Sequence, residues 1–343
     1  MHRYALLGLL PAALGCLDPK NNPCASYMSA NQATASAFCA TFTQSKATAS
    51  TGLPAWAANC SNKPSMISKE CSCYFTGGAA AGPTQTSTST AKTTAAQQTT
   101  AKTTATAAPI VTAAPSGVTT KLPQSSGAVS SSKAITLTAG QVFDGGMKNY
   151  DRSPAVCQGQ TETGEADAMF VLEDGATLQN VIIGPNQAEG VHCKGTCTLI
   201  NVWWEDVCED ALTLKQESGT SNVIGGGAFH ADDKVVQFNG FGTVSITDFY
   251  ANDYGKLVRS CGNCKNNGGA RHVVLDGVKA VDGGVLCGIN TNYGDTCTVT
   301  NSCQDDGKSC DRFEGNSDGD EPPKIGSGPD GTYCKVTGLS TTC

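Results

Sequence analysis

The chain has 343 residues and a formal net charge of −7, with 15% charged and 39% hydrophobic residues. A chain this acidic is not expected to bind nucleic acid or another polyanion through charge alone, so an anionic partner requires a recruited cation. The 39 glycines favour short strands and frequent turns over long amphipathic helices.

The N-terminus has the features of a secretion signal. His2 and Arg3 form a weak basic region, residues 4–14 are apolar, and a small-residue cleavage pattern ends at Gly15. The apolar run is too short to span a bilayer. We therefore expect a signal peptide over residues 1–15, secretion to the extracellular space, and no membrane attachment after cleavage.

The chain contains 18 cysteines, six from Cys16 to Cys73 and twelve from Cys157 to Cys343. In an exported protein, two even groups indicate two separately disulfide-bonded modules. The first module, residues 16–78, is short enough to need such cross-links for stability. Its role stays open between carbohydrate binding and an inert accessory.

Two features of the N-terminal region predict glycosylation. Asn59 begins an Asn-Cys-Ser triplet, which matches the acceptor pattern for N-glycosylation. Residues 79–132 are rich in Ala, Thr, Ser and Gln and show no hydrophobic period. They predict a disordered linker that carries O-linked sugars.

From residue 133 onward, short β-rich runs alternate with turn residues in a repeating pattern. Asn-Val dipeptides begin at Asn180, Asn201 and Asn222, which are 21 residues apart. This period, with short strands and without the dense leucines of a leucine-rich repeat, is typical of a solenoid of stacked coils. We therefore predict an all-β parallel β-helix over residues 133–343, with a ladder of side-chain amides at the repeated Asn.

The repeat brings acidic residues of successive coils together. Residues one period apart stack about 4.8 Å apart, so Glu189 and Asp210, which are 21 residues apart, become neighbours with Glu209 alongside. Three carboxylates this close repel one another unless a cation joins them, and an all-oxygen set suits Ca²⁺ rather than Zn²⁺. A solvated network of surface ion pairs is the alternative explanation.

Basic residues continue the same column. Lys234 is 24 residues after Asp210, and Lys256 and Arg259 are 22 and 25 residues after Lys234. A cation held on a uronate carboxylate acidifies the neighbouring C5 proton, which a neutral amine or guanidinium-supported base can remove. The column therefore suits β-elimination on polygalacturonate, and a cation explains how an acidic protein holds an acidic polymer.

A lysine base has to be neutral, and an ordinary lysine pKa is about 10.4. Either neighbouring cations such as Lys256 and Arg259 lower the pKa of Lys234, or the enzyme works best in alkali. We expect an alkaline optimum.

Several motifs occur in the same order in one known family: residues 141–146, 180–184, 189–193, 203–215, 231–235 and 255–259. In these runs the chain resembles the polysaccharide lyase family 3 pectate lyases, of a secreted fungal type with a Cys-rich extension. The resemblance covers roughly residues 134–343 and leaves out the N-terminal module.

The resemblance implies a right-handed parallel β-helix and calcium-dependent cleavage of (1→4)-α-D-galacturonan to 4,5-unsaturated products, in pectin degradation. By position, Glu189, Glu209 and Asp210 resemble the calcium ligands of the family. Bacterial members can have Asp where Glu189 stands, which shifts the reach of that ligand.

The resemblance also assigns roles to the basic residues. Lys234 matches the proposed base, and Arg259 matches the residue that stabilises developing charge or assists proton transfer, although these two roles can exchange. Lys256 lies nearby, and Lys215 matches a contact with substrate carboxylates, as Lys256 and Arg259 also do. We expect polygalacturonate or pectin as the partner of a monomer.

Two other functions remain open. A polygalacturonase-like hydrolase needs two carboxylates, which Asp232-Asp233 or Glu209-Asp210 can supply, but the basic column is then unexplained. A non-catalytic pectin-binding wall protein is the second alternative. Cys261 and Cys264 form a C-x-x-C pair that predicts a structural disulfide rather than a redox centre.

Overall fold

The structure is a computed structural model that describes residues 23–31, 35, 38–39, 54–60, 67, 71 and 117–343. The predicted signal peptide, residues 1–15, and most of the predicted linker lie outside the described residues. The chain divides into two compact units, one over Cys16–Ala113 and one that contains Ala114–Cys343. Within the described ranges, no helix is both long enough and apolar enough to cross a membrane.

The N-terminal unit is built on a short helix, α1 (Pro23–Ala30), and a 3₁₀ turn, η1 (Ala55–Cys60). Disulfides join Cys24 to Cys60 and Cys39 to Cys71. The ring of Tyr27 stacks on that of Trp56 with centroids 5.2 Å apart. Among the described residues of this unit, the buried apolar side chains form one small cluster that includes the four bridged cysteines, so the disulfides cross-link this core.

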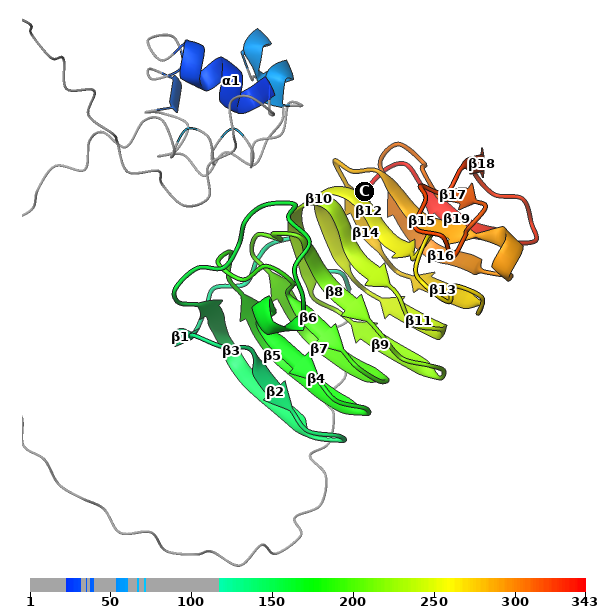
Figure 1. Ribbon diagram of the computed structural model, residues 1–343, viewed down its shortest axis with the longest axis horizontal. Helices are drawn as coiled ribbons and strands as arrows, with labels where there is room; N and C mark the ends of the chain where they lie inside the picture. The colour runs from blue at the N-terminus through cyan, green and yellow to red at the C-terminus, as the bar shows by residue number, and fades with distance from the viewer. Residues whose placement is uncertain are drawn as a thin grey trace, which may run out of the picture. The chain divides into compact units, whose positions relative to one another are not determined.

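The C-terminal unit is a parallel β-helix, as predicted, and Figure 1 shows its coils stacked one on another. Its strands form one sheet of 19 strands in which β17 and β18 make the antiparallel pairing. The strands are β1 (Ala128–Ser131), β2 (Ile135–Leu137), β3 (Val142–Arg152), β4 (Phe170–Leu172), β5 (Ala176–Ile183), β6 (Val191–Cys193), β7 (Cys197–Trp204), β8 (Asp210–Leu214), β9 (Thr220–Ile224), β10 (Gly227–Phe238), β11 (Gly242–Thr247), β12 (Tyr250–Ser260), β13 (Arg271–Asp276), β14 (Lys279–Val281), β15 (Val285–Asn290), β16 (Thr296–Gln304), β17 (Cys310–Phe313), β18 (Lys324–Ser327) and β19 (Cys334–Ser340). Two 3₁₀ turns, η2 (Glu165–Asp167) and η3 (Thr291–Tyr293), interrupt the loops.

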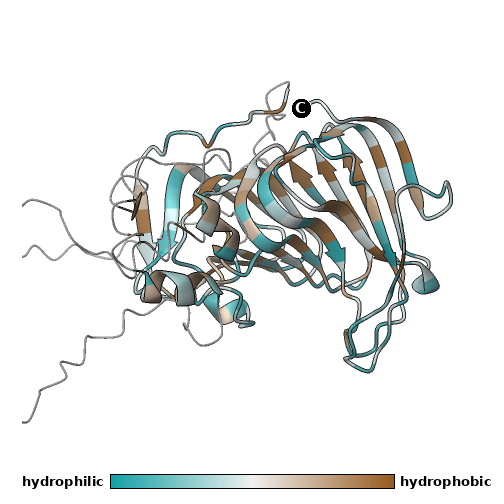
Figure 2. Ribbon diagram, turned by 90° about the horizontal axis from the view of Figure 1, so that it is seen from above, coloured by the Kyte–Doolittle hydropathy of each residue, from teal (hydrophilic) through white to brown (hydrophobic). Residues whose placement is uncertain are grey.

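The core of the solenoid consists of columns of aliphatic side chains. One column, read from coil to coil, contains Leu178, Leu199, Val223, Ile246, Leu275 and Val299. Each of these residues is at most 3% exposed, and the strands carry apolar stretches along their length in Figure 2. Burial of one such side chain contributes about 1.5–3 kcal/mol, so the repeat is held by apolar stacking.

The predicted ladder of asparagines is confirmed between Asn180 and Asn201, but the prediction is wrong for Asn222. Asn201 donates from Nδ2 to Oδ1 of Asn180 at 2.9 Å, and both residues have φ of 54°. Asn222 instead pairs with Thr198, because the coil that follows Asn201 is longer than 21 residues. Gly225, with φ of 64°, follows Ile224 and takes the left-handed corner that Asn201 occupies one coil earlier.

Disulfide bonds cross-link the β-helix at several places. The C-x-x-C pair forms the Cys261–Cys264 bridge, as predicted. The Cys287–Cys297 and Cys310–Cys334 bridges stack on each other in the core, because Cys287 pairs with Cys310 and Cys297 with Cys334. The clustered sulfurs there are therefore bonded to one another rather than available to a metal.

Candidate active site

Three parallel strands position the central charged residues. Lys234 on β10 pairs with Asp210 on β8 and with Lys256 on β12. The Val191–Leu212 pairing, extended back by two residues, places Glu189 beside Asp210. Four of the residues singled out from the sequence thus lie on consecutive coils in the predicted order.

Lys234 is surrounded by carboxylates. Its Nζ lies 3.4 Å from Asp210 Oδ1, 3.6 Å from Glu209 Oε1 and 2.5 Å from Asp233 Oδ2. The other oxygen of Asp233, Oδ1, accepts from Lys256 Nζ at 2.6 Å. The side chains of Glu209, Asp210 and Lys234 are at most 7% exposed, whereas those of Asp233 and Lys256 are 38% and 34% exposed. The network is therefore buried on the side of the carboxylate pair and reaches solvent at Asp233 and Lys256.

Glu189 is held by donors on both of its oxygens. Thr163 donates to Oε1 from its backbone N at 3.0 Å and from its hydroxyl at 2.8 Å, and His192 Nε2 lies 3.1 Å from Oε2. Burial raises the pKa of Glu189, but the contacts with His192 and Thr163 outweigh it and lower the pKa overall. Glu189 therefore stays ionised although it is 4% exposed.

The pKa values of Glu209 and Asp210 are raised, unlike that of Glu189. Burial raises the pKa of Glu209, with Glu162 and Glu189 adding to it, and burial and Glu209 raise the pKa of Asp210 well above its usual range. Glu209 Oε2 and Asp210 Oδ1 are buried without a hydrogen-bond donor. Buried acceptor oxygens without donors suit a hard divalent cation such as Ca²⁺.

The pKa of Lys234 is raised, whereas one of the two expectations from the sequence is that Lys256 and Arg259 lower it. Burial lowers it, but Asp210, Asp233 and Glu209 outweigh burial and raise it above the ordinary lysine value. Lys256 does not act as a nearby unscreened cation, because Asp233 lies between the two amines. The surroundings of Lys234 therefore do not lower its pKa in the calcium-free protein, and the alkaline optimum stays a prediction.

Arg259 lies beside the column rather than in it. It pairs with Gln237, three residues beyond Lys234 along the strand. Its Nη1 donates to Ser260 O at 2.8 Å and to Asn290 Oδ1 at 3.2 Å, and its guanidinium lies 4.0 Å from the ring centroid of Phe313. Burial lowers the pKa of Arg259 to about 10, so the group remains a cation at neutral pH.

Two further sequence candidates are placed by the structure. Lys215 directly follows β8 and is exposed, with its Nζ 3.6 Å from Glu165 Oε2. Asn59 is exposed in the N-terminal unit and donates from Nδ2 to Trp56 O at 2.9 Å.

The sequence reasoning missed Asp233, Thr163 and His192 as contributors to this cluster. Asp233 was visible as the residue before Lys234, but nothing in the repeat distinguishes it from Asp232. Thr163 lies on a loop outside the repeat and has no sequence signal. His192 contacts Glu189, and the neighbouring Cys193 is bonded to Cys197.

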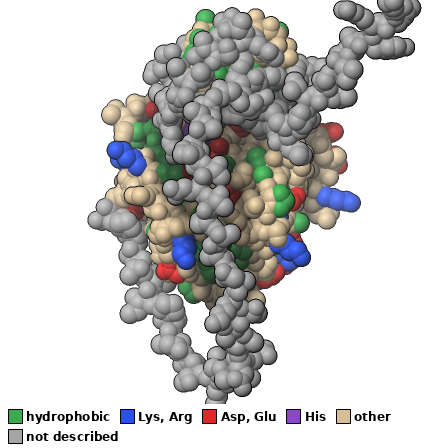
Figure 3. Space-filling view, turned by 90° about the vertical axis from the view of Figure 1, so that its left-hand side faces the viewer, with side chains coloured by type: hydrophobic (Ala, Val, Ile, Leu, Met, Phe, Trp, Pro, Cys, Tyr) green, Lys and Arg blue, Asp and Glu red, His purple; other side chains and the backbone are tan. Residues whose placement is uncertain are grey.

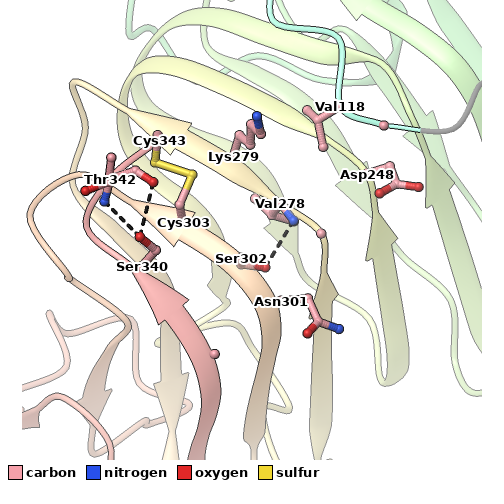
Figure 4. A pocket seen from close by; sticks show the side chains of 13 residues that line it. Val118, Asp248, Val278, Lys279, Asn301, Ser302, Cys303, Ser340, Thr342 and Cys343 are labelled. Atoms are coloured by element: carbon pink, nitrogen blue, oxygen red, sulfur yellow. Dashed lines mark hydrogen bonds between the residues drawn. A yellow bond between two sulfur atoms is a disulfide. The ribbon is translucent and has the colours of Figure 1, made fainter.

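The site residues Glu189, Glu209, Asp210 and Lys234 are buried. A surface pocket of about 450 Å³ lies elsewhere, at a corner lined by Asp248, Lys279, Asn301 and the Cys303–Cys343 bridge, and contains no residue of the cluster (Figure 4). Among the atoms drawn in colour in Figure 3, basic side chains lie apart from one another.

The fold and the site define a parallel β-helix enzyme with a carboxylate and lysine cluster. A family model described as "Pectate lyase" matches residues 119–319. The chain is 52% identical over 227 residues to pectate lyase H of Emericella nidulans, covering 66% of this chain and 86% of the relative. It is also 52% identical over 207 residues to probable pectate lyase F of Aspergillus terreus, with 60% and 88% covered.

Solved structures agree with this comparison. The catalytic domain of pectate lyase PelI from Erwinia chrysanthemi matches with a TM-score of 0.51 and 29% identity, over 63% of this chain and 97% of that one. PelI in complex with tetragalacturonic acid matches with a TM-score of 0.50 and 31% identity, over 63% and 70%. The chain belongs to the pectate lyase family and is an enzyme of that class.

Proposed function

We propose that this enzyme cleaves polygalacturonate by calcium-dependent β-elimination, with Glu189, Glu209 and Asp210 holding the ion. The observation that carries the proposal is the pair of buried oxygens, Glu209 Oε2 and Asp210 Oδ1, that have no hydrogen-bond donor beside a buried lysine. The substrate class is supported by the similar PelI enzyme, which was crystallised with tetragalacturonic acid.

The roles of the residues follow from their contacts. Bound calcium would polarise the uronate carboxylate and so acidify the proton on C5. Lys234 Nζ takes that proton, the C5 electron pair forms the C4–C5 double bond, and the C4–O bond breaks. The leaving oxygen takes a proton from water, which gives a 4,5-unsaturated product and a free sugar hydroxyl. A cation on Glu209 and Asp210 also offsets the negative charge that raises the pKa of Lys234, which favours the neutral amine.

The other basic residues bind and stabilise charge. Arg259 is engaged by backbone carbonyls and by Phe313, which suits a fixed cation that stabilises the developing carbanion rather than a base. Lys256 is fixed by Asp233 next to Lys234. Lys215 is exposed at the end of β8 and suits contact with a further sugar carboxylate.

We further propose that the enzyme acts outside the cell as a monomer, after loss of a signal peptide over residues 1–15. The proposed layout is a Cys-rich module over residues 16–78, a linker that begins at residue 79 and a lyase domain. The predicted boundary at residue 133 is too late, because β1 (Ala128–Ser131) already pairs with β3 in the β-helix. An N-linked sugar on Asn59 is compatible with the exposure of that side chain.

One assay tests the proposal. The purified protein is incubated with polygalacturonate, first with calcium and then with a chelator, while the ultraviolet absorbance of the conjugated double bond is followed. We expect absorbance to rise only with calcium. New reducing ends without that absorbance would identify a hydrolase, and binding of pectate without turnover would identify a wall-binding protein.

A further inference from the structure

A long loop covers one side of the carboxylate cluster. This rim loop, residues 153–169, connects β3 to β4 and contains η2. Hydrogen bonds fix both of its ends: Val156 N donates to Asn186 O at 2.8 Å, and Ala188 N donates to Asp167 O at 3.0 Å. The loop is therefore anchored to the neighbouring coil on both sides of its exposed middle.

The middle of the rim loop contacts Glu189 directly. Thr163 points both its backbone N–H and its hydroxyl at one oxygen of Glu189 while its own side chain remains exposed. Hydrogen bonds to a carboxylate are roughly twice as strong as neutral ones. Together with His192 on the second oxygen, they leave Glu189 a single orientation.

The same loop is bonded to the coil that carries the other two carboxylates. The Cys157–Cys208 disulfide joins the rim loop to the residue directly before Glu209 and Asp210. Gln160 Nε2 donates to Cys208 O at 2.6 Å, beside that bridge. One loop thus holds both halves of the cluster, Glu189 on one coil and the Glu209-Asp210 pair on the next.

We propose that the rim loop preorganises the calcium site, with Thr163 as a positioning residue for Glu189 and the Cys157–Cys208 bridge as the anchor. The inference rests on the proposed function, which places calcium on these carboxylates. Three like charges in a buried patch repel one another, so an unbraced cluster would move apart before the ion binds. A brace removes the free-energy cost of gathering the ligands and so raises calcium affinity.

The first test changes Thr163 alone. Thr163→Val keeps the shape and the backbone N–H but removes the hydroxyl donor, whereas Thr163→Ser keeps that donor. Calcium affinity is measured by titration calorimetry on the intact protein without substrate. We expect Thr163→Val to weaken it about tenfold, and Thr163→Ser to stay within about twofold of the wild type.

Kinetics separate positioning from a general loss of structure. At saturating calcium, Thr163→Val should turn over polygalacturonate at close to the wild-type kcat, while the calcium concentration for half-maximal activity rises about tenfold. Equal calcium affinity of Thr163→Val and wild type overturns the inference and leaves the proposed function intact. Absence of calcium binding to the wild type overturns both.

The second test removes the anchor. The double variant Cys157→Ser/Cys208→Ser is compared with Cys303→Ser/Cys343→Ser, which removes a bridge at the remote corner in Figure 4. The two bridges span 51 and 40 residues, so both variants should lose similar thermal stability. We expect only the first to lose calcium affinity, by about tenfold.

Equal calcium affinity in both double variants and the wild type overturns the role of the anchor, and so does an equal loss in both. Circular dichroism reports whether each variant folds. If Cys157→Ser/Cys208→Ser does not fold, the result for Thr163→Val alone decides the inference.

Discussion

Lys234 and Asp210 are direct partners in the pairing of β10 with β8, and Lys234 Nζ lies 3.4 Å from Asp210 Oδ1. The contact lacks hydrogen-bond geometry, since Asp210 Oδ1 has no donor. The lysine therefore offsets part of the charge of the carboxylates without satisfying their oxygens. We therefore expect the stability of the cluster to depend on a bound cation and on each of its charged residues.

Asp210→Asn is expected to change stability and calcium response in opposite directions. The pKa of Asp210 is raised by burial and by Glu209, so the ionised group destabilises the calcium-free fold at neutral pH. The amide removes that charge, and Lys234 keeps Glu209 and Asp233 as partners. We expect a higher Tm without calcium, and a calcium affinity at least about tenfold weaker.

Thermal melts with and without calcium check this prediction. Asp318→Asn, which changes an exposed carboxylate of the C-terminal segment, is the control and should behave as wild type. A lower Tm of calcium-free Asp210→Asn would show that the pair with Lys234 outweighs the repulsion between carboxylates.

Lys234→Ala should abolish turnover while the protein still binds polygalacturonate. A general base contributes about 10²–10⁴ to the rate, so kcat should fall by at least that factor. The truncation also leaves buried carboxylates without a counterion, which costs about 3–5 kcal/mol in the calcium-free protein. Calcium should restore part of that stability but none of the activity.

The control for this variant is Lys194→Ala, which removes an exposed lysine paired with Glu173. Product absorbance gives the rates, and chemical unfolding gives the free energies. Substantial activity in Lys234→Ala would transfer the role of the base to another residue, with Arg259 the first to examine.

The pH–rate profile should rise toward alkaline pH. A lysine with its ordinary pKa of about 10.4 is almost fully protonated at neutral pH, and its neutral fraction grows about tenfold with each pH unit. At saturating calcium, log(kcat/KM) should therefore increase with a slope near one through the neutral range. A profile with its maximum in the acidic range is incompatible with a lysine base.

The regular part of the fold and of the site could be predicted because coil length fixes which residues are neighbours. Glu189 and Asp210 lie one 21-residue coil apart, and Lys234 pairs with both Asp210 and Lys256 as their spacing indicated. The same reasoning failed at Asn222, since one longer coil shifts every later residue relative to the repeat.

Arg259 and Thr163 show the two other limits of the sequence argument. The spacing of 25 residues from Lys234 to Arg259 suggested stacking, but Arg259 is opposite Gln237 and faces Phe313 of a later coil. Thr163 lies on the rim loop, which has no counterpart in other coils. The position of this loop is fixed by the disulfide between its Cys157 and Cys208. Contacts made by insertions depend on loop conformation, which periodicity does not encode.

The C-terminal segment should lose stability in acid through Asp330. Its Oδ1 accepts from the backbone N–H groups of Thr332, Tyr333 and Cys334 at 2.8–3.0 Å, and its Oδ2 lies 2.6 Å from Arg312 Nη1. Burial raises the pKa of Asp330, but these donors together outweigh it and lower the pKa to about 2. Because the folded pKa lies below the unfolded one, the stabilisation is present above the ordinary value of 3.8 and is lost as pH falls toward 2. After allowance for solvent screening it amounts to about 1 kcal/mol.

Asp330→Asn keeps an acceptor oxygen for the backbone N–H groups and removes only the charge. At neutral pH the variant should therefore be about 1 kcal/mol less stable than wild type in urea unfolding. At pH about 2 the wild-type carboxyl is half protonated in the folded protein and most of the stabilisation is lost, so the urea midpoints of the two proteins should move close together. A difference that persists unchanged from neutral pH to pH about 2 would mean that the shape of the side chain, and not its charge, holds this turn against Arg312.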